Sequence, residues 1–247
     1  MLMQGKTVLI TGCRRGIGKA IVETFAAHGA DIYAHARCED KTFMAEMEFL
    51  SQKYSVDILP VFFDLTDKTA MQSAVRKIIA QNTPIDAVIN NAGVAENSLF
   101  QMTSETQLRN QFEVNFFSVY FFCQYMVKIM LKNKKGSLIN IASTAAEDGN
   151  PGKSAYGASK AALVAMTQSI ASEMGHCGIR ANVISPGITD TDMLQTMQAN
   201  VVEDAINKTS LKRAGRPSEV ADLALYLASD LSGYITGQVI RVDGGLK

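Results

Sequence analysis

Short apolar runs recur along the whole chain, and the segments between them repeat apolar residues at helical spacing. The runs are rich in β-branched and aliphatic residues and hold few polar ones, which is typical of strands buried on both faces of a parallel sheet. We therefore predict seven strands, at residues 7–11, 31–35, 56–63, 87–90, 137–142, 181–185 and 238–242.

The segments between these runs are predicted to be helices. Ile17, Ile21 and Phe25 share one face of a helix that ends at His28-Gly29. The other clear helices are expected at residues 66–81, 104–131, 155–174 and 217–228. Alternating strands and helices imply right-handed βαβ crossovers. The expected fold is α/β: a single-domain doubly wound Rossmann fold, with a seven-stranded parallel sheet flanked by helices on both faces.

The domain organisation is expected to be simple. The sequence has no repeat, low-complexity tract or linker, so residues 1–247 are interpreted as one nucleotide-binding and catalytic domain. The polar segment 187–215 lies between the sixth strand and the last helix. A segment of that length in a compact domain is typical of a substrate flap, and the alternative is a plain surface excursion.

Composition and charge exclude several classes of protein. The 247 residues include 24 basic and 24 acidic side chains, which gives no long-range attraction to nucleic acid or anionic lipid. Polar residues interrupt the apolar stretch 114–131, so no membrane span is expected, and the chain begins directly with a predicted strand rather than a secretory signal. The four cysteines contain no C-x-x-C pair, which argues against a zinc site or a disulfide framework. A soluble, reduced, cytoplasmic protein without a metal is expected.

A glycine-rich turn follows the first strand and opens a helix, with the sequence TGCRRGIG at residues 11–18. Glycines in this position allow a tight turn and let a pyrophosphate approach the helix N-terminus. A P-loop is excluded because Ala20 follows Lys19 where Ser or Thr is required, and Cys13 stands in place of the first glycine. A strand–helix turn without any ligand is the alternative.

The residue type after the second strand indicates which nucleotide the turn holds. An NAD binder carries an acid there for the ribose hydroxyl, whereas this chain has Arg37. Arg37, helped by Arg15, could pair with the 2′-phosphate of NADP(H). NADP(H) is therefore favoured. Glu39 and Asp40 keep NAD(H) open as the less favoured cofactor, and both arginines could simply be solvated.

Tyr156 and Lys160 are four residues apart at the start of a predicted helix, so their side chains share one face. A nearby ammonium and a cationic nicotinamide would favour the phenolate. Lowering the tyrosine pKa from about 10 to about 7 requires roughly 4 kcal/mol of differential stabilisation. Such a tyrosine could donate a proton to a carbonyl oxygen while Ser143 holds that oxygen by a hydrogen bond. Without its context, a Tyr-x-x-x-Lys pair is more often a surface coincidence.

These motifs together resemble the short-chain dehydrogenase/reductase family over essentially the full length of the chain. The matching positions occur in the family's order: TGxxxGIG at 11–18, Asp64-Leu65, Asn90-Asn91-Ala92-Gly93, Asn115, Ser143, Tyr156 with Lys160, and Pro186-Gly187. The resemblance implies catalytic roles for Asn115, Ser143, Tyr156 and Lys160. It implies cofactor contacts for Gly12, Arg14, Arg15, Gly16, Ile17, Gly18, Arg37, Asp64, Leu65, Asn90, Asn91, Ala92, Gly93, Tyr156, Lys160, Pro186, Gly187, Ile188 and Thr191.

The family also implies what the separate residues would do. Asp64 and Leu65 would contact the adenine, residues 91–93 would line the adenosine side, and Ile188 with Thr191 would hold the carboxamide. Lys160 would bind the nicotinamide ribose. Asn115 would hold a water in a proton relay to Lys160, and its alternative role is to satisfy a buried backbone group.

Within the family, residues 185–193, the YITG at 234–237 and the DGG at 243–245 resemble 3-oxoacyl-acyl-carrier-protein reductases. This resemblance implies NADPH-dependent reduction of a 3-oxoacyl thioester, carried by acyl carrier protein or CoA, in fatty-acid biosynthesis. The second reading is an oxidoreductase for a sugar, polyol, steroid or other small secondary alcohol or ketone. A third is a protein that binds NADP(H) without turnover, against which the intact Ser143, Tyr156 and Lys160 argue.

Two kinds of partner follow from the resemblance. Acyl carrier protein would need basic residues around the active-site entrance, and Lys132, Lys134 and Lys135 are candidates, whereas Ser172 departs from the expected basic position. A homotetramer is expected as well. Its candidate interface residues are Phe112, Phe116, Phe117, Tyr120, Phe121, Val127, Met130, Gly157, Ala158, Ala161 and Ala162.

Overall fold

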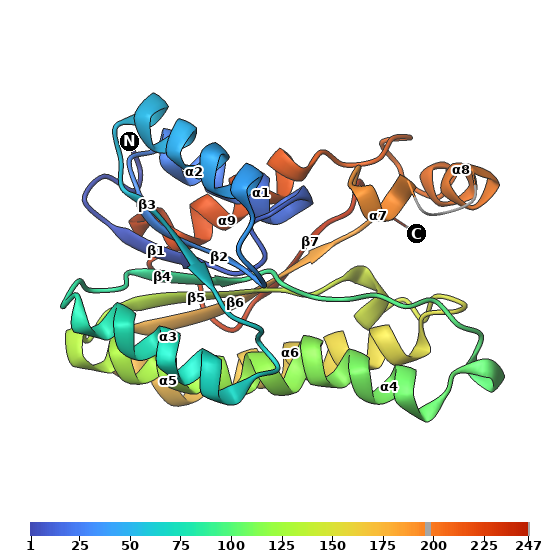
Figure 1. Cartoon of the computed structure of the whole chain (residues 1–247). Helices are drawn as coiled ribbons and strands as arrows, with labels where there is room; N and C mark the ends of the chain where they lie inside the picture. The colour runs from blue at the N-terminus through green and yellow to red at the C-terminus, as the bar shows by residue number, and fades with distance from the viewer. Residues whose placement is uncertain (196–198, 247) are drawn as a thin grey trace.

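The computed structural model describes residues 1–195 and 199–246 and contains a parallel sheet in its centre (Figure 1). Its strand order is β3-β2-β1-β4-β5-β6-β7. The predicted doubly wound parallel sheet is confirmed, and each strand lies within two residues of its predicted bounds. The strands are β1 Thr7–Ile10, β2 Asp31–Ala36, β3 Ile58–Phe62, β4 Ala87–Asn90, β5 Gly136–Ile141, β6 Ile179–Pro186 and β7 Val239–Val242.

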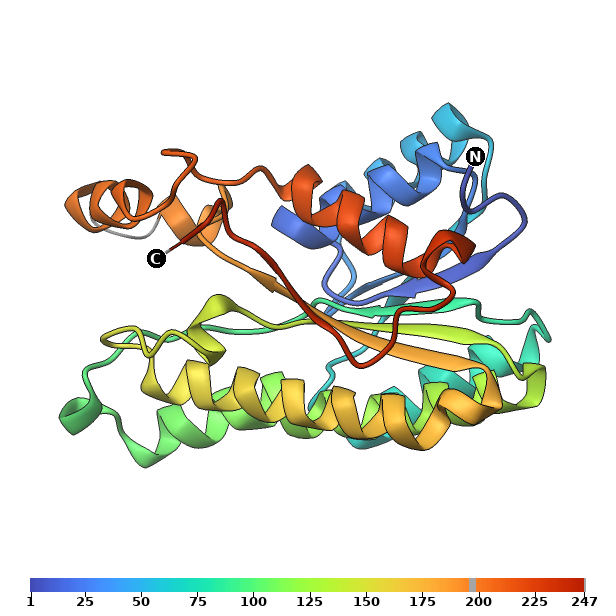
Figure 2. The same cartoon turned by 180° about the vertical axis from the view of Figure 1, so that it is seen from behind.

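Helices cover both faces of the sheet (Figures 1 and 2). The helices α1 Gly16–Ala27, α2 Lys41–Tyr54 and α9 Pro217–Ala228 pack on one face, and α3 Lys68–Ala80, α5 Ser118–Asn133 and α6 Ser154–Met174 pack on the other. Shorter elements are α4 Glu105–Phe112, α7 Asp192–Gln195, α8 Ala199–Asn207, η1 Phe100–Met102, the π-helical η2 Glu113–Phe117, η3 Thr144–Ala146, η4 Gly175–Cys177 and η5 Asp230–Ser232.

Two helical features differ from the sequence analysis. Helix α2 was not predicted, although Phe43, Met47 and Leu50 recur at i, i+4 and i+7 and are buried, and Asp40 caps it by accepting a hydrogen bond from the Phe43 amide. The long helix expected at 104–131 is divided into α4, the π-helical η2 and α5. The segment 187–215 contains α7 and α8, while residues 196–198, like Lys247, lie outside the described residues. Its role as a substrate flap stays a prediction.

The helical stretch Glu105–Asn133 is long and apolar enough to cross a membrane by length and composition alone, within the part of the chain that the structure describes. Core helices pass the same test, and 44% of its most apolar window is buried inside the protein. Val119, Phe122 and Met126 of this stretch belong to the core beneath the sheet. The stretch is therefore weak evidence for a membrane span.

A buried histidine supports the glycine-rich turn from the sheet. His35 near the end of β2 accepts a hydrogen bond on Nδ1 from the Gly12 amide at 3.4 Å, and its Nε2 lies 2.8 Å from the Phe63 carbonyl oxygen beyond β3. The neutral tautomer protonated on Nε2 satisfies both contacts. Burial lowers the pKa of His35 to about 4, even though the Phe63 carbonyl and the nearby Asp64 favour the cation. His35 thus joins the ends of three neighbouring strands while remaining neutral.

We expect His35 to make the fold sensitive to acid. In the unfolded chain His35 binds a proton near pH 6.5, whereas in the folded protein it does so only near pH 4. Neutral His35 therefore contributes its full stabilisation to the folded state above pH 6.5, and this stabilisation is lost as the pH falls toward 4. The loss amounts to roughly 3 kcal/mol. Urea unfolding of the wild type and of His35→Gln at pH 7.5 and pH 4.5 measures it. A stability difference between the two proteins that does not change with pH would contradict the assignment.

Candidate active site

The predicted site residues gather at the carboxyl ends of the strands. The turn at 12–18 follows β1, Arg37 follows β2, Asp64 and Leu65 follow β3, Asn91 to Gly93 follow β4, Ser143 follows β5, and Pro186 to Ile188 end or follow β6. In open α/β sheets this edge is where ligands bind, next to the point where the strand order reverses. Here that point lies between β1 and β4, which are neighbours.

Close backbone approach shapes the glycine-rich turn. Gly12 and Gly16 have φ angles of +73° and +56°, a region that favours glycine. A Cβ at Gly18 would overlap the Gly12 carbonyl oxygen, so α1 can pack this close to the turn only with glycine there. At the start of α1 the structure shows no side-chain cap among the described residues, and no acidic side chain lies in its first turn. The amide groups there fit a pyrophosphate.

The loop after β4 is tied to the end of β1. The Asn91 side-chain amide donates to the carbonyl oxygens of Thr11 and Gly12, both at 3.1 Å, and the Thr11 hydroxyl oxygen accepts from the amides of Asn91 and Ala92 at 3.0 and 3.1 Å. Asn91 therefore braces the two strand ends on either side of the switch point. Asn90 differs, since its buried side chain donates to Asn140 at 2.7 Å and lies inside the protein.

The arginines predicted near the nucleotide are all paired with carboxylates. The distance from Arg37 Nε to Asp64 Oδ2 is 2.8 Å, and the Arg37 side chain is 81% exposed. Partial burial would raise the pKa of Asp64, but hydrogen bonds from Thr66 and the Arg37 guanidinium hold it below its usual range. Arg14 pairs with Asp40 at 2.7 Å, and Arg15 reaches Asp192 at the start of α7 at 3.4 Å. A phosphate at this position would have to compete with these carboxylates.

Tyr156 and Lys160 lie on α6, and the Lys160 ammonium is 5.9 Å from the centre of the Tyr156 ring. Burial raises the pKa of the Tyr156 phenol, and a hydrogen bond with Ser143 opposes this rise. In the protein itself the pKa therefore moves opposite to the expected lowering, because desolvation outweighs the hydrogen bond with Ser143. Forming the phenolate requires positive charge close to its oxygen.

Lys160 is a buried cation in an apolar setting. Its side chain is buried, its ammonium donates to the Ile141 carbonyl oxygen at 2.8 Å, and burial lowers its pKa to about 8. A Cβ at Gly93 would lie 3.3 Å from the Lys160 Nζ and 3.1 Å from the Asn115 Oδ1, so the glycine leaves room for both side chains.

The Asn115 side chain is fully occupied by the protein. Its Oδ1 accepts from the Val94 amide at 2.8 Å, and its Nδ2 donates to the Val94 carbonyl at 2.9 Å and to the Ser159 hydroxyl at 3.0 Å. The structure thus shows the backbone-satisfying role that was the alternative for Asn115. It lies in the π-helical η2 next to Lys160, and its part in a proton relay stays a prediction.

The lysines considered for carrier docking lie away from these residues. Lys132, Lys134 and Lys135 precede the amino end of β5, whereas Ser143 follows its carboxyl end, and Ser172 is likewise near the far end of α6. Within one chain these lysines therefore lie at the opposite edge of the sheet from the candidate active site. The expectation that they flank the entrance is wrong for the single chain.

The candidate interface residues are only partly available. Phe117, Tyr120 and Phe121 are exposed on η2 and α5, but Met130 is buried. Gly157 is buried too, and a Cβ there would overlap the Ala145 carbonyl oxygen, so its small size serves packing inside the chain.

Thr191, one of the predicted cofactor contacts, lies against the glycine-rich turn, where a Cβ at Gly16 would be 3.2 Å from its methyl group.

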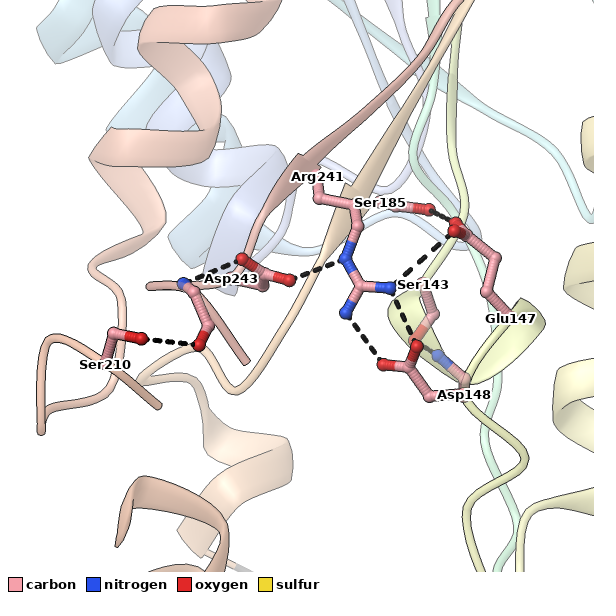
Figure 3. Close-up of polar contacts among 9 residues, drawn as sticks. Ser143, Glu147, Asp148, Ser185, Ser210, Arg241 and Asp243 are labelled. Carbon is pink, nitrogen blue, oxygen red and sulfur yellow. Dashed lines mark hydrogen bonds and ion pairs between the residues drawn. The ribbon is translucent and has the colours of Figure 1, made fainter. Parts of the chain in front are cut away.

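The sequence analysis did not identify two residues of this edge as parts of the site. His35 supports the glycine-rich turn, and its position one residue before the end of β2 was the signal that could have found it. Arg241 of β7 contacts the turn that follows Ser143 (Figure 3), and no local signal marks a contact between residues 93 positions apart.

Several known proteins are similar to this chain over nearly its full length. A sequence model of the family described as enoyl-(acyl carrier protein) reductase matches residues 12–247. The 3-oxoacyl-acyl-carrier-protein reductase FabG of Thermotoga maritima is 37% identical over 248 residues, covering 100% of this chain and 99% of the relative. The proteins of the same name from Chlamydia muridarum and Escherichia coli K12 are 35% and 32% identical, covering 99% and 100% of this chain and 98% and 99% of the relatives.

Solved structures agree with the sequence relatives. A structure described as a short-chain dehydrogenase/reductase family protein has a TM-score of 0.85 at 32% identity and covers 99% of this chain and 98% of its own. A protein from Agrobacterium tumefaciens described as a gluconate dehydrogenase has a TM-score of 0.93 at 28% identity, with 98% and 96% covered. The chain therefore belongs to the short-chain dehydrogenase/reductase family, whose members are nicotinamide-dependent oxidoreductases that act on CH–OH and C=O groups.

Proposed function

We propose that this enzyme reduces a 3-oxoacyl thioester, linked to acyl carrier protein or CoA, to the 3-hydroxyacyl thioester with NADPH. The observation that carries the proposal is the full-length similarity to several proteins named 3-oxoacyl-acyl-carrier-protein reductase. Tyr156 and Lys160 on α6, with Ser143 beside them, give it a chemical basis.

NADPH fits the residues at the carboxyl edge. The uncapped start of α1 and the glycine-rich turn suit the pyrophosphate, and Asn91 keeps that turn in place. Arg37 and Arg15 would bind the 2′-phosphate. To do so, Arg37 would release Asp64 and Arg15 would release Asp192. Because Arg37 is largely exposed, its ion pair with Asp64 contributes little free energy, and breaking it costs little. Bound NADPH would supply the hydride that reduces the carbonyl carbon.

The protein's own residues would handle the proton. Ser143 would hold the carbonyl oxygen by a hydrogen bond, and Tyr156 would donate its phenolic proton to that oxygen. The raised pKa of Tyr156 keeps the proton available at neutral pH, which suits reduction. The phenolate left behind would be stabilised by the Lys160 ammonium, whose buried setting strengthens the attraction.

A sugar acid is the second candidate substrate. The likeness to the Agrobacterium tumefaciens protein described as a gluconate dehydrogenase favours it, since the two folds superimpose with a TM-score of 0.93. The same Ser143, Tyr156 and Lys160 would serve a polyol or sugar alcohol as well. The two candidates therefore differ in substrate contacts rather than in chemistry.

Three further features belong to this proposal. We infer a homotetramer, for which the exposed Phe117, Tyr120 and Phe121 are the remaining apolar candidates. Acyl carrier protein would be the physiological partner, and a cytoplasmic location would follow from that partner.

Loss of NADPH absorbance at 340 nm with acetoacetyl-CoA tests the function. We expect turnover by the wild type, and a loss of at least 100-fold in Tyr156→Phe because the proton donor is gone. Tyr54→Phe on α2 is the matched control and should retain full activity. Gluconate oxidation with NADP⁺ is measured in parallel, and turnover there without any acetoacetyl-CoA reduction would replace the proposed substrate with the second candidate.

Cofactor choice is tested by Arg37→Asp. We expect NADPH binding, followed by fluorescence titration, to weaken roughly 10- to 100-fold, because a charge-assisted hydrogen bond is replaced by repulsion. NADH binding should change little. Arg76→Asp makes the same charge change at an exposed site on α3 and serves as the control. Equal losses for NADPH and NADH would disprove the assignment of the 2′-phosphate site.

A further inference from the structure

Arg241 near the end of β7 is held by three carboxylates (Figure 3). Its Nη1 and Nη2 donate to the two oxygens of Asp148 at 2.7 and 2.8 Å, and its Nε donates to Asp243 Oδ2 at 2.6 Å. Glu147 Oε2 lies 3.6 Å from Nη1. We call these four residues, Glu147, Asp148, Arg241 and Asp243, the Arg241 clasp.

One side of the clasp is the turn that begins at Ser143. The Ser143 carbonyl accepts from the Ala146 amide at 2.9 Å, and the Thr144 carbonyl accepts from the amides of Glu147 and Asp148 at 3.0 and 2.9 Å. The turn from Ser143 to Asp148 is therefore one compact unit. Helix α6 supports its start, where Tyr156 is hydrogen-bonded to Ser143, and its middle, where Gly157 packs against Ala145. The far end of the turn is held by Arg241 and by a hydrogen bond from the Ser185 hydroxyl to Glu147 at 3.4 Å.

The other side of the clasp reaches the base of the 187–215 segment. Asp243 Oδ1 accepts from the Gly245 amide at 2.9 Å, and the Gly245 carbonyl accepts from the Ser210 hydroxyl at 3.0 Å. The Gly244 carbonyl accepts from the Leu211 amide at 3.0 Å. Hydrogen bonds through Arg241, Asp243 and the backbone of Gly245 thus join the Ser143 turn to Ser210 (Figure 3). The neighbouring Gly244–Leu211 bond ties the same segment down.

The clasp has the properties of a positioning device. A bidentate arginine–carboxylate pair fixes orientation as well as distance. The side chains of Arg241, Asp148 and Asp243 are 29%, 26% and 11% exposed, so the pairs are partly shielded from water. Hydrogen bonds from Arg241 and the Gly245 amide hold the pKa of Asp243 below its usual range despite its burial. The Asp148 and Asp243 hydrogen bonds raise the pKa of Arg241, so the ion pair between Arg241 and Asp243 persists at neutral pH.

We propose that Arg241 is a positioning residue that holds the Ser143 turn in register with the base of the 187–215 segment. This inference rests on the proposed function, in which Ser143 holds the substrate carbonyl oxygen. Arg241 touches neither Tyr156 nor the glycine-rich turn in the described contacts, and its clasp partner Asp243 packs against Gly187 just after β6. We expect its role to lie in turnover rather than in cofactor binding, and the Kd for NADPH is measured beside kcat to separate the two.

Kinetics of Arg241→Met, Arg241→Lys, Asp148→Asn and the double variant Arg241→Met/Asp148→Asn test the proposal. We expect Arg241→Met to lower kcat with acetoacetyl-CoA about 10- to 100-fold, as misplaced reacting groups do, while the Kd for NADPH changes less than about twofold. Arg241→Lys should recover part of the loss, because it keeps the charge but not the fork. The double variant should lose no more than Arg241→Met, since the pair acts as one unit.

Lys53→Met on α2, which breaks an exposed ion pair with Glu23, is the control and should leave kcat unchanged. An unchanged kcat in Arg241→Met would overturn the proposal, and so would a loss that parallels weaker NADPH binding or multiplicative losses in the double variant. Unfolding midpoints of all variants separate positioning from global destabilisation.

Amide hydrogen exchange tests the clasp without any turnover. In Arg241→Met we expect faster exchange both at residues 146–148 and at residues 210–211, with no change at the hydrogen-bonded amides of α1. Unchanged exchange at either segment would overturn the coupling. If the wild type reduces no 3-oxoacyl thioester, the proposed function fails, and the exchange data still decide whether Arg241 couples the two segments.

Discussion

The close approach of two backbone turns at the switch point between β1 and β4 is the constraint on which the site depends. Gly18 lets α1 start directly against Gly12, and the Asn91 amide fills the space between the two turns with hydrogen bonds to both carbonyls. His35 completes the arrangement from the neighbouring strand. Since the Asn91 and His35 side chains thus fix the Thr11 and Gly12 carbonyls and the Gly12 amide, the amides at the start of α1 are held ready for an anion.

Charge is distributed differently on the two halves of this edge. On the nucleotide side the arginines are exposed and already balanced by Asp40, Asp64 and Asp192, so binding there is an exchange of partners in water. On the catalytic side Lys160 is buried, and its one described hydrogen bond is to the neutral Ile141 carbonyl. In the described contacts no carboxylate neutralises the Lys160 ammonium, so its positive charge can stabilise negative charge that develops on Tyr156. Under the proposed function, the exposed arginines would select the nucleotide and the buried lysine would support the proton transfer.

Sequence patterns were sufficient for the sheet because each strand is a local apolar run, and for the placement of Ser143, Tyr156 and Lys160 because strand ends and helix starts are local as well. They were insufficient for α2, whose buried positions are only Phe43, Met47 and Leu50 among many polar residues. The lysines at 132–135 were assigned to the wrong edge, although their place just before β5 already implies the amino end. The alternative role of Asn115, satisfying a buried backbone group, was predicted, but its partner Val94 was not. That partner and the contact of Arg241 with Asp148 could not be foreseen, since both join residues far apart in the sequence.

The Arg241 clasp also bears on the choice between the two candidate substrates. Its three carboxylates, Glu147, Asp148 and Asp243, face a single guanidinium, so the clasp itself carries an excess of negative charge, while the Lys160 ammonium supplies positive charge beside Tyr156. Glu147 is the least committed of the three, with its side chain 42% exposed and Ser185 donating to it at 3.4 Å. A sugar acid would bring its own carboxylate toward this excess and be repelled, whereas a thioester presents a neutral carbonyl. The clasp therefore disfavours a substrate whose carboxylate would lie beside Glu147, which gives a physical criterion for separating the two candidates.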